Sequence, residues 1–168
     1  MSEIRKHYFL SEYCIIADER AKRPSDFAKA AEDSGKSSPA SCSFCGVAEE
    51  STPMATAVYK NGKIFADTPE KRIRNWDFRC FPNLYPAFSP VLYPSGHQEV
   101  GLEAEPGYGF HEVVVESPLH GRRLENFSGL ELSGLMRVYR DRSCNYIIRE
   151  QYGTSPYLKT QGKPQELP

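Results

Sequence analysis

The stretch TAVYKNGKIFAD at residues 56–67 decides the predicted fold. It has two β-rich arms around Asn61-Gly62, the dipeptide that best tolerates the positive backbone angles of a type I′ turn, so it predicts an antiparallel hairpin. Two further strands are predicted in the aromatic segment WDFRCFPNLYPAF at 76–88 and in FHEVVVESP at 110–118. Short strands and turns therefore dominate this part of the sequence.

The segments outside these strands predict one helix and several loops. The apolar stretch YCII within residues 4–16 fits another strand, whereas 28–40 and 91–109 are rich in small, polar or turn-forming residues and predict loops. Residues 124–142 place apolar side chains near helical spacing, with Ser128 as a suitable N-cap. Strands outnumber helices, so the sequence predicts an α+β fold, a mostly antiparallel sheet with few helices.

The composition restricts the class of protein. The length of 168 residues suggests one domain or part of one, and a net charge of -1 argues against a broad nucleic-acid-binding surface. No apolar run approaches the roughly 18 residues of a membrane span, and the N-terminus lacks the order of a signal peptide. We therefore expect a cytoplasmic protein whose partners include neither nucleic acid nor membrane. Its five cysteines are expected to be thiols or metal ligands rather than disulfides.

The motif CSFCG contains the first candidate metal ligands, Cys42 and Cys45. A C-x-x-C spacing lets two thiolates reach one tetrahedral ion from a single turn, and Gly46 lets the backbone turn away after the second ligand. Two alternatives remain open: a pair of free thiols in a loop, or a redox-active pair. The redox alternative lacks the strand-then-helix context of a thioredoxin-like motif. Zinc is the metal that this motif favours.

A third ligand is predicted at His120. This histidine lies just beyond a predicted strand that Pro118 ends, at a corner from which a side chain can point into a site. Cys14 and Cys80 sit in strand-like apolar runs and are expected in the core. The remaining histidines are interpreted as exposed or strand residues: His7, His97 and His111.

Two features could bind a nucleotide. Arg20 and Arg23, in the sequence ERAKRP, could hold a phosphate with paired hydrogen bonds around a proline-fixed turn, although a solvated basic turn is the simpler interpretation. The aromatic residues of 76–88 could line a base or fill a core, and a core is the default expectation. Asn83 within that segment is the candidate polar contact, since an amide both donates and accepts.

Four motifs in fixed order resemble one known family. ERAKRP, C-x-x-C-G, WDFRCFPNLYPAF and GFHEVVVESPLH are similar to the N-terminal half of galactose-1-phosphate uridylyltransferases, which belong to the histidine-triad-like superfamily. The resemblance runs from about residue 4 to residue 142. It implies a histidine-triad-like half-domain that is truncated, and a nucleotidyltransferase of galactose metabolism. Such enzymes exchange uridylyl between UDP-glucose and galactose 1-phosphate through a uridylyl-histidine intermediate.

The resemblance also implies roles for particular residues. Cys42, Cys45 and His120 match three structural zinc ligands of the family. The substrate-binding positions that it implies are Arg20 and Arg23 near the phosphate, and Asn83 and Leu84 at the nucleotide. The family's fourth zinc ligand and its nucleophile are the two histidines of a His-Pro-His motif. For intact members of the family, the resemblance implies a homodimer as a possible assembly.

The sequence departs from the family at this last motif. No His-Pro-His occurs, and no histidine follows His120. No catalytic residue is therefore assigned, and the chain as written is expected to be inactive. Two alternatives stay open: a non-catalytic zinc- or nucleotide-binding fragment, and a related nucleotidyltransferase or phosphorylase with another substrate.

The last residues suggest a hypothesis about the gene. When allowed codons for YLKTQGKPQELP at 157–168 are read from their third base, they can encode FKNAGKAAGAS, the phrase that the family has before His-Pro-His. We interpret residues 1–142 as an incomplete uridylyltransferase-like domain. Residues 143–168 are interpreted as an out-of-frame or disordered tail that follows a frameshift near 142–145. A gene sequence whose shifted frame lacks the phrase would refute this hypothesis.

Overall fold

The computed structural model describes residues 2–22, 42–91 and 104–152. The chain forms two compact units, Met1–Phe127 and Ser128–Pro168, and each is described by itself. The first unit holds two sheets, one of three strands and one of four. Every pairing between their named strands is antiparallel, which confirms the predicted α+β class with its mostly antiparallel sheet.

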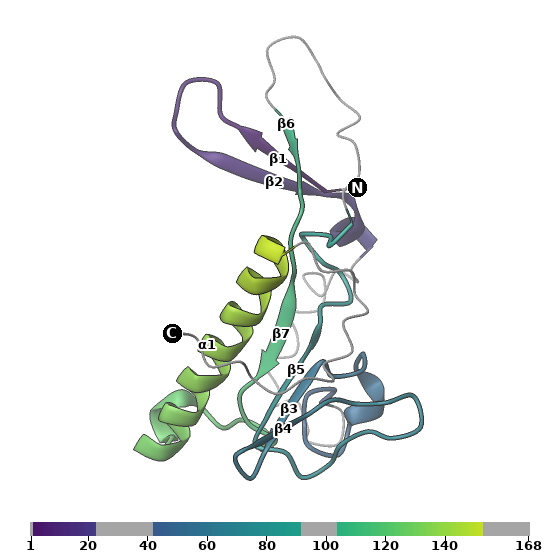
Figure 1. Ribbon diagram of the computed structural model, residues 1–168, viewed down its shortest axis with the longest axis vertical. Coiled ribbons are helices and arrows are strands. Elements are labelled where there is room, and N and C mark those ends of the chain that lie inside the picture. The colour runs from purple at the N-terminus through teal and green to yellow at the C-terminus, as the bar shows by residue number, and fades with distance from the viewer. Residues whose placement is uncertain (1, 23–41, 92–103, 153–168) are drawn as a thin grey trace, which may run out of the picture. The chain divides into compact units, whose positions relative to one another are not determined.

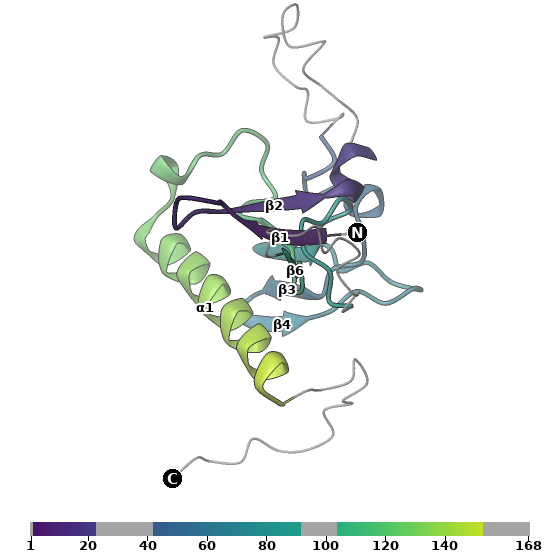
Figure 2. The ribbon, with the colours of Figure 1, turned by 90° about the horizontal axis from the view of Figure 1, so that it is seen from above.

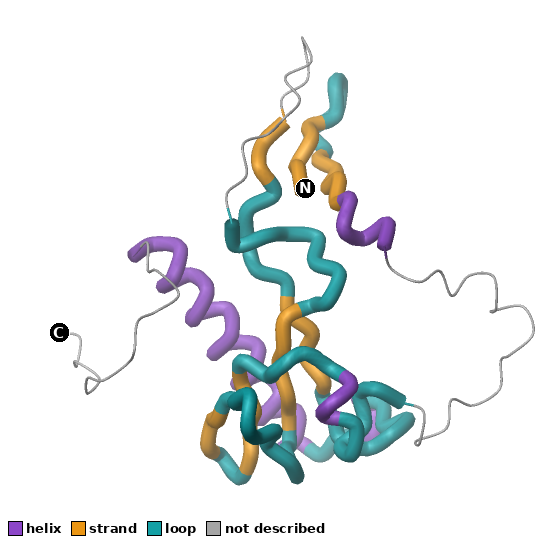
Figure 3. The backbone as a smooth tube through the Cα atoms, turned by 90° about the vertical axis from the view of Figure 1, so that its right-hand side faces the viewer, coloured by secondary structure: helices purple, strands orange, loops and turns teal. Residues whose placement is uncertain are grey.

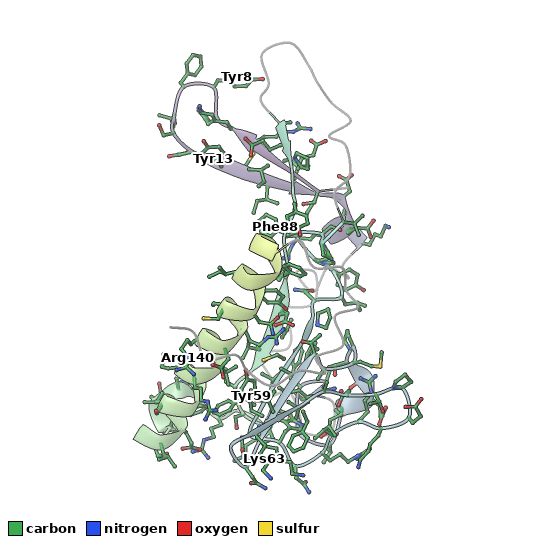
Figure 4. All side chains as sticks on the ribbon, in the orientation of Figure 1. Tyr8, Tyr13, Tyr59, Lys63, Phe88 and Arg140 are labelled. Carbon is green, nitrogen blue, oxygen red and sulfur yellow. The ribbon has the colours of Figure 1, made fainter. Side chains whose placement is uncertain are left out.

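The three-stranded sheet has the order β2-β1-β6 (Figure 1). Its strands are β1 Ser2–Lys6, β2 Tyr13–Ala17 and β6 Ala104–Pro106. The side chains of Tyr8 and Tyr13 project from the β1–β2 hairpin, and they are 67% and 64% exposed (Figure 4). The prediction that Cys14 lies in the core is wrong, because β2 is an edge strand of this small sheet and the thiol is exposed.

The four-stranded sheet has the order β4-β3-β5-β7, and Figure 2 shows β3 and β4 side by side. Its strands are β3 Ala57–Lys60, β4 Lys63–Phe65, β5 Phe78–Pro82 and β7 Glu112–Val115. The predicted hairpin is confirmed, since the turn residues Asn61 and Gly62 have φ angles of 50° and 73°.

The core of the first unit lies on the four-stranded sheet. Buried side chains of this core come from two strands and the segments beside them: Ala55, Val58, Trp76 and Phe81. Ile73, Val113 and Val115 pack against them. Cys80 is fully buried, as predicted. Burial of these apolar surfaces is the main favourable term that holds strands β3, β5 and β7 together.

A buried ion pair lies beside this core. Asp67 accepts a hydrogen bond from the Arg79 guanidinium at 2.6 Å, and the two side chains are 0% and 2% exposed. The same carboxylate accepts the backbone N–H groups of Ala55 at 2.9 Å and Ile73 at 2.8 Å, and it contacts Arg72 at 3.2 Å. A buried charge is tolerated only when it is paired and hydrogen-bonded, and Asp67 meets both conditions.

The second unit is built on one long helix, α1 Gly129–Tyr152. The predicted N-cap is confirmed, because the Glu131 N–H donates to Ser128 Oγ at 3.3 Å and the Glu131 carboxylate accepts the Ser128 N–H at 2.8 Å. This reciprocal pair is a capping box. The helix continues past residue 142, through ten residues of the segment predicted to be a tail. Among the described residues, no helix is long and apolar enough to cross a membrane.

Candidate metal centre and nucleotide loop

The knuckle, defined here as residues 42–48, consists of turns and belongs to the loops drawn in teal in Figure 3. The Cys45 N–H donates to the Cys42 carbonyl at 3.4 Å, and the Ala48 N–H donates to the Cys45 carbonyl at 3.0 Å. These turns keep the two cysteines on one short stretch of backbone. Cys45 is buried, whereas Cys42 is half-buried.

The knuckle contacts the corner that follows β7. The Gly46 N–H donates to the Pro118 carbonyl at 3.0 Å, and a Cβ atom at Gly46 would lie 2.8 Å from Pro118 Cβ. Real Cβ atoms essentially never come so close, so the approach requires glycine. His120 follows Pro118 by two residues, and this contact therefore brings the histidine to the two cysteines.

The three predicted metal ligands form one cluster. The Sγ atoms of Cys42 and Cys45 and a ring nitrogen of His120 all lie within 4.8 Å of one another. Cys45 Sγ is 3.3 Å from His120 Nδ1. Bonds of about 2.3 Å to sulfur and about 2.0 Å to nitrogen in a tetrahedral zinc site place these two atoms roughly 3.6 Å apart. The donor set and its spacing therefore fit zinc after a shift of a few tenths of an ångström.

The pKa values of the two thiols are shifted in opposite directions. A hydrogen bond from the Phe44 backbone lowers the pKa of the Cys42 thiol against the opposing effect of burial. Burial raises the pKa of the Cys45 thiol above its ordinary value. A metal binds the thiolate form, so zinc binding must displace a proton from Cys45. Metal affinity is therefore expected to rise with pH.

Substitution Gly46→Ala tests the contact between knuckle and corner. The added Cβ would displace Pro118 and move His120 away from the thiols, so we expect zinc affinity to fall about tenfold or more, the scale seen when a supporting contact of a metal site is lost. Competition with a chromogenic zinc chelator measures the change. Gly129→Ala is the matched control, since a Cβ at Gly129 meets nothing within 4 Å. Unchanged zinc affinity in Gly46→Ala would show that this contact does not position the ligands.

The candidate nucleotide loop, residues 83–87, begins where β5 ends. The Asn83 N–H donates to the His111 carbonyl at 2.9 Å, which extends the β5–β7 ladder by one bond. The Asn83 Oδ1 atom accepts the Tyr85 N–H at 2.9 Å and so closes a tight Asx turn. Leu84, at the tip of this turn, is 68% exposed. An exposed apolar side chain beside a fixed amide could contact a flat ring.

The basic turn is described only in part. Arg20 lies in the 3-10 helix η1 Asp18–Lys22, whereas Arg23 lies outside the described residues. Burial lowers the pKa of His111, and the positive charge of Arg20 lowers it further. Arg20 is therefore close enough to His111 for their charges to interact, and His111 in turn contacts Asn83. The substrate-binding roles of Arg20, Arg23, Asn83 and Leu84 stay predictions.

His111, predicted only as a strand residue, contacts the candidate nucleotide loop. The strand pairing sets Pro82 opposite Glu112, and the next step of the ladder sets Asn83 opposite His111. If the antiparallel register of the predicted strands at 76–88 and 110–118 were known, it would have revealed this neighbour. The sequence alone does not give the register, so it contains no signal for this contact.

Comparison with known proteins identifies a curated sequence relative. The chain is 32% identical over 163 residues to ADP-glucose phosphorylase from Arabidopsis thaliana, and the match covers 95% of this chain and 43% of the relative. No family model matches the chain.

Two solved structures from Arabidopsis thaliana are also similar at 27% identity. An ADP-glucose phosphorylase with bound ADP-glucose gives a TM-score of 0.43 over 86% of this chain and 38% of that chain. A GalT-like protein gives a TM-score of 0.42 over 62% of this chain and 29% of that chain. Superpositions at these scores do not define a shared fold, so the sequence identity carries the relationship.

By sequence, the chain is homologous to ADP-glucose phosphorylase. The comparison does not single out the uridylyltransferase that the motifs resemble. The chain spans less than half the length of this relative.

The sequence match also reaches the segment interpreted as an out-of-frame tail. A coverage of 95% leaves about eight of the 168 residues unaligned, which is fewer than residues 143–168 contain. Part of that segment therefore aligns with the relative in the frame as written. The boundary at residue 142 stays a prediction.

Proposed function

We propose that this chain forms the zinc-bearing, sugar-nucleotide-binding part of a nucleotidyl-transferring enzyme of the ADP-glucose phosphorylase type. The observation that carries the proposal is the 32% identity to that enzyme along almost the whole chain. The cluster of Cys42, Cys45 and His120 supports it independently, because the motif resemblance and the geometry point to the same three residues.

Zinc would be held by Cys42, Cys45 and His120, with a further donor completing the tetrahedron. Two thiolates and an imidazole are the ligands of structural zinc sites, in which the metal ties separate segments together. Here it would join the knuckle to the corner after β7, a second link beside the hydrogen bond from Gly46 to Pro118. The metal's role in this proposal is to fix the backbone from which the nucleotide loop extends.

The sugar nucleotide would be held by four residues. In this proposal Arg20 and Arg23 contact phosphate oxygens, and Asn83 and Leu84 contact the nucleoside. ADP-glucose is the first candidate ligand, since the relative named for it has the highest sequence identity reported above. The second candidate is uridylyl exchange between UDP-glucose and galactose 1-phosphate, which the order of the four sequence motifs favours.

The chain's own residues support binding rather than turnover. The histidines at positions 7, 97, 111 and 120 include no His-Pro-His pair. Covalent nucleotidyl transfer needs a nucleophile beside the phosphorus, and none of these 168 residues is assigned that role.

Calorimetric titration of the zinc-loaded chain with ADP-glucose and with UDP-glucose tests the proposal. We expect ADP-glucose to bind more tightly, and Asn83→Ala to weaken it about 5- to 10-fold, the equivalent of one or two lost hydrogen bonds. The exposed Asn126→Ala serves as control. Tighter binding of UDP-glucose, displaced by galactose 1-phosphate, would select the second candidate. No binding of either sugar nucleotide would overturn the proposed function.

A further inference from the structure

His111 makes contacts at the nucleotide loop that the proposed function leaves unexplained. Its imidazole touches the loop at both ring nitrogens: the Ala87 N–H donates to Nδ1 at 2.9 Å, and Nε2 lies 3.1 Å from Asn83 Nδ2. The ring is half-buried, so it is held by the loop and still has access to solvent.

These contacts fix the protonation of the ring. A backbone N–H can only donate, so Nδ1 is the acceptor and the neutral imidazole carries its proton on Nε2. The Asn83 Oδ1 atom already accepts the Tyr85 N–H, which turns the Asn83 amide nitrogen, a donor, toward Nε2. Two N–H donors therefore face each other, an arrangement that one shared acceptor would satisfy.

Other assignments do not remove this surplus of donors. Moving the ring proton to Nδ1 sets it against the Ala87 N–H, and rotating the Asn83 amide sets its nitrogen against the Tyr85 N–H. Each choice leaves two donors facing each other in one of the three contacts. The contact between Asn83 Nδ2 and His111 Nε2 is the easiest to open to an acceptor, because a side chain can rotate and a backbone N–H cannot.

The charges near the ring favour an acceptor with negative charge. Burial and, after it, the positive charge of Arg20 lower the pKa of His111, which favours the neutral ring. The acidic neighbour Glu112 accepts the Thr56 hydroxyl at 2.5 Å. Two neutral N–H donors that also feel the positive charge of Arg20 form a suitable environment for an anionic oxygen.

We propose that His111 Nε2–H and Asn83 Nδ2–H form a donor pair that binds one acceptor atom of the sugar nucleotide. This inference rests on the proposed function and adds His111 as a ligand-binding residue, with Ala87 holding its tautomer. A phosphoryl oxygen, an atom of the base or a sugar hydroxyl oxygen can each be that acceptor. The charge of Arg20 favours the phosphoryl oxygen, and Asn83 would then contact the phosphate rather than the nucleoside.

The variant His111→Asn removes the Nε2–H donor and keeps an acceptor for the Ala87 N–H. An asparagine carbonyl occupies nearly the place of Nδ1 and can accept the Ala87 N–H, but the shorter side chain does not reach the place of Nε2. We expect ADP-glucose affinity to fall about 5- to 10-fold with an unchanged melting temperature. His7→Asn is the matched control, because the exposed His7 also accepts backbone N–H groups through Nδ1.

Simpler ligands identify the acceptor. A loss of affinity for pyrophosphate in His111→Asn assigns a phosphoryl oxygen, and a loss for adenosine assigns an atom of the nucleoside. Nitrogen NMR of the unsubstituted chain adds a measurement that needs no variant: the ring should be the Nε2–H tautomer, and its Nε2 signal should shift when ADP-glucose is added.

The inference and the proposed function can fail separately. If the wild type binds ADP-glucose and His111→Asn binds it equally well, the function stands and the donor pair is overturned. An Nδ1–H tautomer, or an Nε2 signal that ADP-glucose leaves in place, overturns the donor pair as well. A wild type that binds no sugar nucleotide overturns the proposed function and, with it, this inference.

Discussion

Cys45→Ser is expected to abolish stoichiometric zinc binding. Serine replaces a thiolate with a hydroxyl, a poor zinc ligand, and only two of the three clustered donors remain. The loss should exceed the roughly 10- to 100-fold that removal of a mere supporting contact causes. Zinc content of protein purified without chelator, measured by mass spectrometry, gives the result directly. Because Cys45 is buried, its substitution can also disturb folding, so Cys42→Ser, at the half-buried cysteine, should be measured as well.

The exposed Cys144→Ser provides the control for this experiment, and it should retain the zinc of the wild type. A wild-type chain that neither carries nor binds zinc would contradict the metal assignment. If the two knuckle cysteines then react reversibly with disulfide reagents, the redox interpretation of the C-x-x-C motif replaces it.

The second large effect is expected at the buried ion pair. Asp67→Asn removes one charge and leaves the Arg79 guanidinium, 2% exposed, without its counter-ion. Breaking a buried pair in this way costs about 3–5 kcal/mol of unfolding free energy. Chemical denaturation monitored by circular dichroism measures the loss. Asp77→Asn is the control, since this exposed carboxylate accepts one backbone N–H and should cost about 1 kcal/mol or less.

The effect of Asp67 should also depend on pH. Burial alone would raise the pKa of Asp67, but the N–H groups of Ile73 and Ala55 and the Arg79 and Arg72 guanidiniums outweigh it and lower the pKa. A lowered carboxyl pKa contributes stability that is present above the unfolded value of about 3.9 and is lost as pH falls through the folded value. The difference between wild type and Asp67→Asn should therefore shrink below about pH 4. A difference that stays constant from pH 7 to pH 3 would show that charge is not its cause.

Local sequence signals predicted the elements whose structure is locally determined. The Asn61-Gly62 turn has the positive φ angles that its hairpin requires, and Ser128 caps its helix as expected. Strand β6 was missed because its three residues, within a segment rich in glycine and proline, become a strand only by pairing with β1, about a hundred residues earlier. The exposure of Cys14 was missed for a similar reason, since an apolar run does not reveal whether its strand lies at an edge.

In the candidate site, too, local features were predictable and contacts between distant segments were not. The C-x-x-C spacing made Cys42 and Cys45 identifiable, and the corner after β7 pointed to His120, which the structure brings to both thiols. The close approach of Gly46 to Pro118 has no sequence pattern of its own, because it depends on two segments meeting in space. No sequence pattern predicts the Asp67–Arg79 ion pair either, because in the sequence both residues resemble ordinary surface charges.

Trp76 gives the molecule an optical reporter of its own. It is the only tryptophan in the chain, it is 3% exposed, and its indole N–H donates to Glu49 Oε1 at 3.0 Å. Glu49 begins the short helix η4 Glu49–Ser51, directly after the knuckle. All tryptophan emission from this protein therefore arises from one indole that is hydrogen-bonded to the side chain of Glu49, just after the knuckle. Changes in that backbone can be followed by the colour of its fluorescence, without any attached dye.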